Sequence, residues 1–124
     1  MAKMNAWMTD AAYLLMRLVV GLMFAQHGAQ KLFGVLGGHH VPLLSQAGAA
    51  GIIEFFGGLL VAFGIFTTWA AIIASGEMAV AFFQVHWPQG VFPIVNKGES
   101  AVVYCFVFLF IASRGGGRWK VAGR

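Results

Sequence analysis

Residues 17–34 read RLVVGLMFAQHGAQKLFG, a stretch that is apolar around most of a helical circumference. One face carries two cations and two glycines around a phenylalanine, at spacings of four, three, four and three residues: Arg17, Gly21, Phe24, Gly28 and Lys31. Small residues let membrane helices approach closely, and charges inside a membrane face other helices. The stretch therefore predicts a membrane-spanning helix with its charged stripe turned inward.

The composition of the whole chain agrees with this prediction. Of the 124 residues, 60% are hydrophobic and only 10% are charged, too few to give a soluble domain its polar surface. The single cysteine, Cys105, excludes an internal disulfide. Half of the eight Lys and Arg residues lie in the last eleven positions, which is typical of a cytoplasmic flank and does not indicate a nucleic-acid partner. We expect the lipid bilayer to be the main partner.

The sequence contains four apolar runs, each close to the length that a helix needs to cross a bilayer. Gly and Pro residues separate most of these runs. They predict an all-α integral membrane four-helix bundle, a single domain over 1–124, with spans at about 11–34, 47–66, 68–86 and 99–113. The first run is too long for a cleaved signal and contains Arg17. The cationic tail and the even number of crossings predict a multi-pass protein with both termini cytoplasmic and the two longer loops outside.

Arg17, Glu54 and Glu77 sit well inside these runs. Each costs about 2.5 to 3.5 kcal/mol or more near mid-bilayer, so we expect them to be paired between helices. Both glutamates lie on stripes of Ala and Gly, which supports burial at helix contacts. Counting residues from the span midpoints favours Glu77 as the partner of Arg17, with Glu54 as the alternative.

His27, Lys31, Gln84 and Glu99 are expected to lie nearer the outer face than these charges. Asn96 is a further candidate for the same polar group. Together they predict a polar intramembrane pocket, open to the outer face, whose residues are Arg17, His27, Lys31, Glu54, Glu77, Gln84 and Glu99. The competing interpretation is that the buried charges only fix helix register. His27 could equally be a hydrogen-bonded core residue.

The remaining histidines and Cys105 are not predicted to form a haem, metal or catalytic site. His86 lies opposite Glu77 on a regular helix and does not face His27, which disfavours a bis-histidine haem. His39 and His40 lack further ligands, so no metal site is predicted. Cys105 is expected to be a packing or lipid-facing residue.

The first helix, the segment IIEFFGGLLVAFGIFT at 52–67, the residues 96–99 and the glycine-arginine ending at 115–119 resemble the DoxX family over nearly the whole chain. Lys97 departs from a glycine common in the family. The resemblance implies a bacterial or archaeal four-helix inner-membrane protein, in a family named from a subunit of a thiosulfate:quinone oxidoreductase. Some members are associated with thiol or oxidative-stress defence partners, and the family carries no firmly assigned catalytic residues.

Three functions are compatible with this sequence. The first is a subunit of a quinone-linked oxidoreductase, with Arg17, His27 or Lys31 as hydrogen-bond donors and Glu54 or Glu77 as proton carriers. The chain has no flavin, iron-sulfur or nicotinamide motif, so a protein partner would supply the electrons, and whether the chain is itself an enzyme stays open. The second is a non-redox binding or transport module for a small lipophilic or anionic molecule. The third is a membrane assembly factor whose small-residue faces recruit other membrane subunits. In place of an electron-donating partner, the chain could form a homo-oligomer.

Overall fold

The computed structural model describes residues 2–123, with side chains described from residue 5 onward. Helices account for most of this part of the chain, which contains an isolated bridge between Ile65 and Ala122 and no β-strand. The elements are α1 (Ala2–Phe33), α2 (Gln46–Phe63), α3 (Thr67–Ala81), the π-helix η1 (Phe82–His86), the 3-10 helix η2 (Trp87–Gln89), α4 (Pro93–Asn96) and α5 (Glu99–Arg114). The all-α prediction is confirmed.

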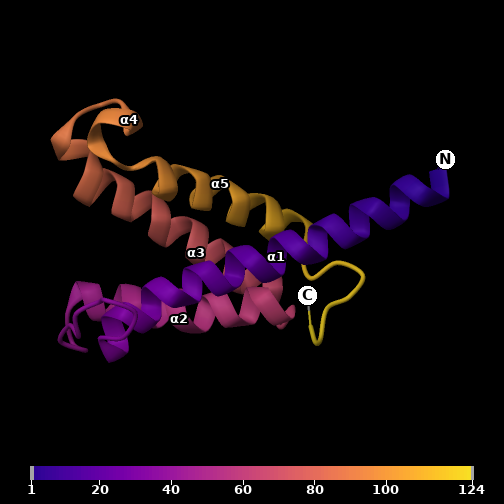
Figure 1. Cartoon of the computed structure of the whole chain (residues 1–124), viewed down its shortest axis with the longest axis horizontal. Coiled ribbons are helices and arrows are strands. Elements are labelled where there is room, and N and C mark those ends of the chain that lie inside the picture. The colour runs from indigo at the N-terminus through magenta and orange to yellow at the C-terminus, as the bar shows by residue number, and fades with distance from the viewer. Residues whose placement is uncertain (1, 124) are drawn as a thin grey trace.

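The four long helices form two antiparallel pairs. α1 packs along α2, α3 packs along α5, and α2 contacts α3 near the short turn that joins them. From that turn the two pairs diverge toward the end of the molecule that carries the long loop after α1 and the short helix α4 (Figure 1). The start of α1 and the C-terminal segment lie at the opposite end (Figure 1). The fold is therefore a V of two helical hairpins.

Glycines set the close crossing of α1 and α2. A Cβ atom added to Gly21 would lie 2.5 Å from the carbonyl oxygen of Gly58, and one added to Gly28 would overlap the backbone around Phe55. No larger residue fits at these positions without moving a helix. The small-residue faces predicted for the first two spans are thus confirmed as helix contacts within the chain.

The C-terminal segment fastens the narrow end of the V. Gly64 ends α2 in a left-handed conformation (φ 73°) that glycine adopts without strain. Its carbonyl oxygen accepts hydrogen bonds from the N–H groups of Val121 and Ala122, at 3.0 and 3.1 Å, and Phe66 N–H donates to the Ala122 carbonyl at 3.0 Å. Residues 64–66 and 121–122 therefore form one hydrogen-bonded unit, although more than fifty residues separate them.

Aromatic side chains connect the two hairpins near the middle of the V. Phe24 of α1 is buried against Tyr104 and Phe108 of α5, with ring centroids 5.4 and 4.7 Å apart.

Within the α3–α5 hairpin, Ser75 donates a hydrogen bond to the Cys105 carbonyl at 2.8 Å. Cys105 is a half-buried packing residue there.

Large apolar side chains cover the outside of the helices, as a hydrocarbon solvent requires. Three segments are long and apolar enough to cross a membrane: Asn5–Phe33, Gln46–Phe63 and Thr67–Gln89. The fourth helix, α5, has 16 residues and a length of about 24 Å, below the roughly 30 Å of the hydrocarbon layer. It runs beside α3 through most of that depth. The membrane prediction is confirmed for the protein, and the fourth run is the shortest of the four.

Candidate functional site

A cavity of about 700 Å³ lies between the two diverging hairpins. Its wall is mostly apolar and draws residues from α1, α2, α3, η1 and α5. This volume lies within the range of roughly 300–1,000 Å³ typical of small-molecule sites. The polar side chains among its lining residues are His27, Lys31, Gln46, Glu54, Glu77, Gln84, His86, Ser100 and Tyr104.

An ion pair between α1 and α2 forms the charged part of this wall. The Lys31 ammonium donates to both carboxylate oxygens of Glu54, at 2.6 and 2.7 Å. The Glu54 side chain is 2% exposed and that of Lys31 is 34% exposed. The Lys31 ammonium offsets the charge of the Glu54 carboxylate in this apolar setting. The expectation that a buried glutamate is paired is therefore correct for Glu54, with Lys31 as the cation.

Glu77 of α3 faces this ion pair from the other hairpin. It lines the same cavity wall and lies close enough to Glu54 and Lys31 for their charges to act on its carboxyl. Its Oε1 atom is buried and has no hydrogen-bond partner in the described part of the chain. A buried polar atom without a partner is costly in an apolar setting. Glu77, a lining residue of the cavity, therefore holds a buried carboxyl oxygen whose hydrogen-bonding capacity is unsatisfied.

Two predicted pocket residues lie at the edges of the cavity. His27 is exposed and its ring meets that of Tyr104 edge to face, with centroids 6.1 Å apart. Gln84 of η1 accepts a hydrogen bond from the side-chain amide of Gln46 in α2. Neither side chain is buried, so both can change partners when a ligand enters.

His86 lines the cavity although a regular helix would turn it away from Glu77. The helix is not regular, because residues 82–86 form a π-helix that rotates the chain before Trp87 and Pro88. His86 Nδ1 lies 3.1 Å from the Asn96 carbonyl oxygen. Pro88 indicated in the sequence that the helix becomes irregular here, but it did not indicate how far the side chain of His86 is rotated.

Arg17 does not contact Glu77 or Glu54, so the predicted pairing is wrong. The guanidinium is buried and donates to the carbonyl oxygens of Gly116 and Trp119, the latter at 3.1 Å. Both acceptors lie in the segment after α5, and their carbonyl oxygens satisfy the guanidinium through charge-assisted hydrogen bonds. Arg17 lies about half a turn from the middle of the span Asn5–Phe33, on its N-terminal side, and its long side chain reaches the glycine turn.

Two other candidates are placed away from the cavity wall. Glu99 is exposed in the first turn of α5 and is not among the lining residues. Asn96 is fully buried in the preceding loop, where its amide donates to the Gly90 carbonyl at 2.9 Å and its oxygen accepts from Gly98 N–H at 2.8 Å. Asn96 therefore holds the shape of the loop.

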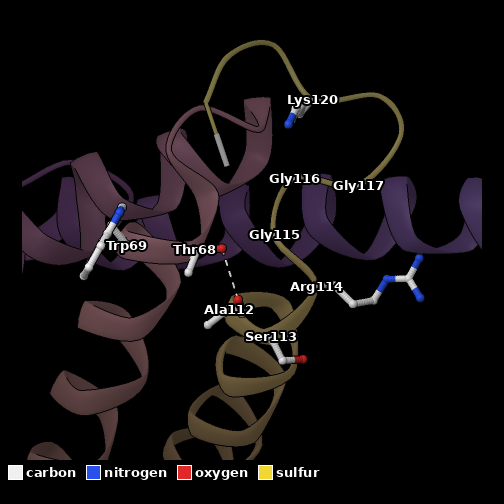
Figure 2. A pocket seen from close by; sticks show the side chains of 9 residues that line it. All are labelled: Thr68, Trp69, Ala112, Ser113, Arg114, Gly115, Gly116, Gly117 and Lys120. Carbon is white, nitrogen blue, oxygen red and sulfur yellow. Dashed lines mark hydrogen bonds between the residues drawn. The ribbon is translucent and has the colours of Figure 1, made fainter.

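A second, smaller cavity of about 430 Å³ lies at the narrow end of the V. Figure 2 shows its wall between the start of α3 and the glycine turn after α5, with Thr68 donating to the Ala112 carbonyl at 3.1 Å. The Arg114 side chain points away from it (Figure 2), and its guanidinium lies 4.9 Å from the centre of the Tyr13 ring. This leaves Lys120 as the cation directed toward that space.

The fold and the larger cavity define the class of protein. It is an integral membrane protein of two helical hairpins, with a cluster of polar side chains in the mostly apolar cavity between them. The chain belongs to the DoxX family, whose model matches residues 12–87. The matched region contains α2, α3 and most of α1, and with them Lys31, Glu54 and Glu77.

A relative from Haemophilus influenzae (strain ATCC 51907 / DSM 11121 / KW20 / Rd) is 38% identical over 109 residues. The match covers 82% of this chain and 81% of the relative, which is described as an uncharacterized protein. No solved structure matches the chain.

Proposed function

We propose that the cavity binds the head group of a quinone and that the protein is the membrane subunit of a quinone-linked oxidoreductase. The observation that carries the proposal is the unpartnered Oε1 of Glu77, a residue of the mostly apolar cavity wall that also holds the Lys31–Glu54 ion pair. A quinone presents carbonyl oxygens that accept hydrogen bonds on an apolar ring, which matches such a wall.

The charges favour Glu77 as the proton-carrying group. One lysine stands beside two carboxyl groups, and the cluster is neutral only when one carboxyl keeps its proton. Lys31 contacts Glu54 through both oxygens, so we assign the proton of this cluster to Glu77. A protonated carboxyl can donate a hydrogen bond to a quinone oxygen and supply a proton when the ring is reduced.

Reduction of a quinone to a quinol consumes two electrons and two protons. The sequence has one cysteine and no motif for a flavin, an iron-sulfur cluster or a nicotinamide, so an electron-donating protein partner belongs to the proposal. Lys31 lies two residues before the end of α1 and Glu77 four residues before the end of α3, so the cluster lies toward the loop end of the V, the outer half of a bacterial inner membrane in the predicted topology.

Copurification tests the proposal. The full chain is extracted in mild detergent from membranes that contain quinones, and bound molecules are identified by absorbance and mass spectrometry. A quinone near one per chain supports the proposal. A different lipid or metabolite in the cavity would replace it with a non-redox binding function, and a stoichiometric protein partner without any ligand would replace it with assembly.

A further inference from the structure

The cavity between the hairpins has two lateral sides, and they differ in how they are closed. The side between α1 and α5 is sealed by aromatic contacts, in which Phe24 packs on Tyr104 and Phe108 and His27 meets Tyr104. A molecule cannot pass here without separating rings that are buried or in contact.

The side between α2 and α3 is bordered by small or exposed residues. Ala49 and Gly76 line the cavity and are exposed, and a Cβ atom added to Gly76 would meet no atom within 4 Å. Next to Gly76 on α3, the lining residues Ile73 and Val80 are 54% and 49% exposed. The border is uncharged and lies within segments that cross the membrane, so it faces lipid.

The outer end of the same gap is bridged. Gln46, at the start of α2, donates a side-chain hydrogen bond to Gln84 of η1, across the space between the two hairpins. The opposite end is closed by the packing of α2 on α3 near residues 64–66. The open part of the gap therefore lies in the membrane, between the Gln46–Gln84 bridge and the turn.

From this geometry we infer that the gap between α2 and α3 is a lateral portal through which an amphiphile enters from the bilayer. Its polar head passes Gly76 and reaches Glu54 and Glu77, while its hydrocarbon tail stays in lipid between Ala49 and Val80. This inference rests on the proposed function for the identity of the head group and adds that the ligand carries a long apolar tail. A small water-soluble ligand has no need of such a path.

Thiol labelling tests the portal without any ligand. Ala50, a small lining residue of α2, is changed to cysteine in a Cys105→Ser background, and the full chain is reconstituted in lipid nanodiscs. We expect a lipid-partitioning pyrene maleimide to label Ala50→Cys readily, and a sulfonated, water-soluble maleimide to label it at least about tenfold more slowly. Adding Gly76→Phe should slow the lipid-partitioning reagent by a similar factor.

Gly57→Phe is the matched control, because a Cβ atom at Gly57 also meets no atom within 4 Å and Gly57 does not line the cavity. It should leave both labelling rates unchanged. Equal labelling by the two reagents, or a rate that Gly76→Phe does not change, would overturn the portal. Failure of quinone binding alone would overturn the proposed function and leave this labelling pattern intact.

Discussion

Lys31 and Glu54 form a two-point ion pair between α1 and α2, with Lys31 Nζ at 2.6 and 2.7 Å from the two carboxylate oxygens of Glu54. Both residues belong to helices that cross at glycines, so the backbones are close enough for the side chains to meet. The pair stabilises this crossing and places one positive and one negative group beside Glu77. Structure and proposed function therefore depend on the same contact.

Removing one partner of this pair should cost more than removing both. Lys31→Met leaves Glu54 buried without its cation, and we expect a loss of about 3 kcal/mol of unfolding free energy, at the low end for buried pairs because Lys31 is partly exposed. The double variant Lys31→Met with Glu54→Met should recover most of it. Denaturation in detergent measures these differences.

The exposed pair of Asp10 and Arg118, at 3.5 Å, is the control for that series. Replacing Asp10 by Asn and Arg118 by Met should change stability by less than about 1 kcal/mol. A Lys31 and Glu54 double variant that is no more stable than either single variant would contradict the pairing argument.

Arg17 should hold the C-terminal segment in place. Arg17→Met removes two charge-assisted hydrogen bonds to backbone carbonyls, each worth about 1.5 to 3 kcal/mol, so the segment should open more often. Trypsin should then cleave after Arg118 and Lys120 at least about tenfold faster. Arg114→Gln, which removes the cation over Tyr13, should have a smaller effect. Cleavage at the wild-type rate in Arg17→Met would remove Arg17 from this role.

The effects of Arg17→Met and Glu77→Met on stability should add, because the two side chains share no partner. Double-variant denaturation against the single variants measures this. Recovery of stability in the double variant would restore the direct pairing that the sequence first predicted.

Replacing a helical glycine by alanine should destabilise the protein only where the glycine lies against another helix. Gly21→Ala places a methyl group against the Gly58 backbone and should destabilise the protein by about 1 to 3 kcal/mol. Gly57→Ala meets no atom within 4 Å and should be neutral or stabilising by up to about 1 kcal/mol. Thermal unfolding of the two variants in one detergent makes the comparison. Equal losses would show that the α1–α2 crossing is not set by backbone contact.

The predicted orientation places the loop after α1 outside and the C-terminal segment in the cytoplasm. Single cysteines in a Cys105→Ser background test it at exposed positions, His39→Cys for the loop and Val121→Cys for the tail. An impermeant maleimide added to intact cells should label the first and not the second. The reverse pattern would invert the topology and move the cavity to the cytoplasmic half.

The sequence was sufficient to predict the stripe from Arg17 to Lys31 and the membrane helices, because helical periodicity and hydrophobicity are properties of single segments. It could not predict the partner of Arg17, because backbone carbonyls of the glycine turn leave no pattern in side-chain identity. The position of His86 was missed for a related reason. A π-helix changes the angle of every later residue, and only the structure shows where it forms.

The central claim is that a quinone head group binds at the cluster of Lys31, Glu54 and Glu77, and equilibrium retention of a radiolabelled isoprenoid quinone in nanodiscs tests it most directly. We predict one quinone per wild-type chain and an affinity at least about tenfold weaker in the charge-free variant Lys31→Met with Glu54→Met, a change of about 1.4 kcal/mol or more. The Asp10→Asn and Arg118→Met control should bind as the wild type does. Absence of binding to the wild type, or equal affinity in the charge-free variant, would contradict the claim.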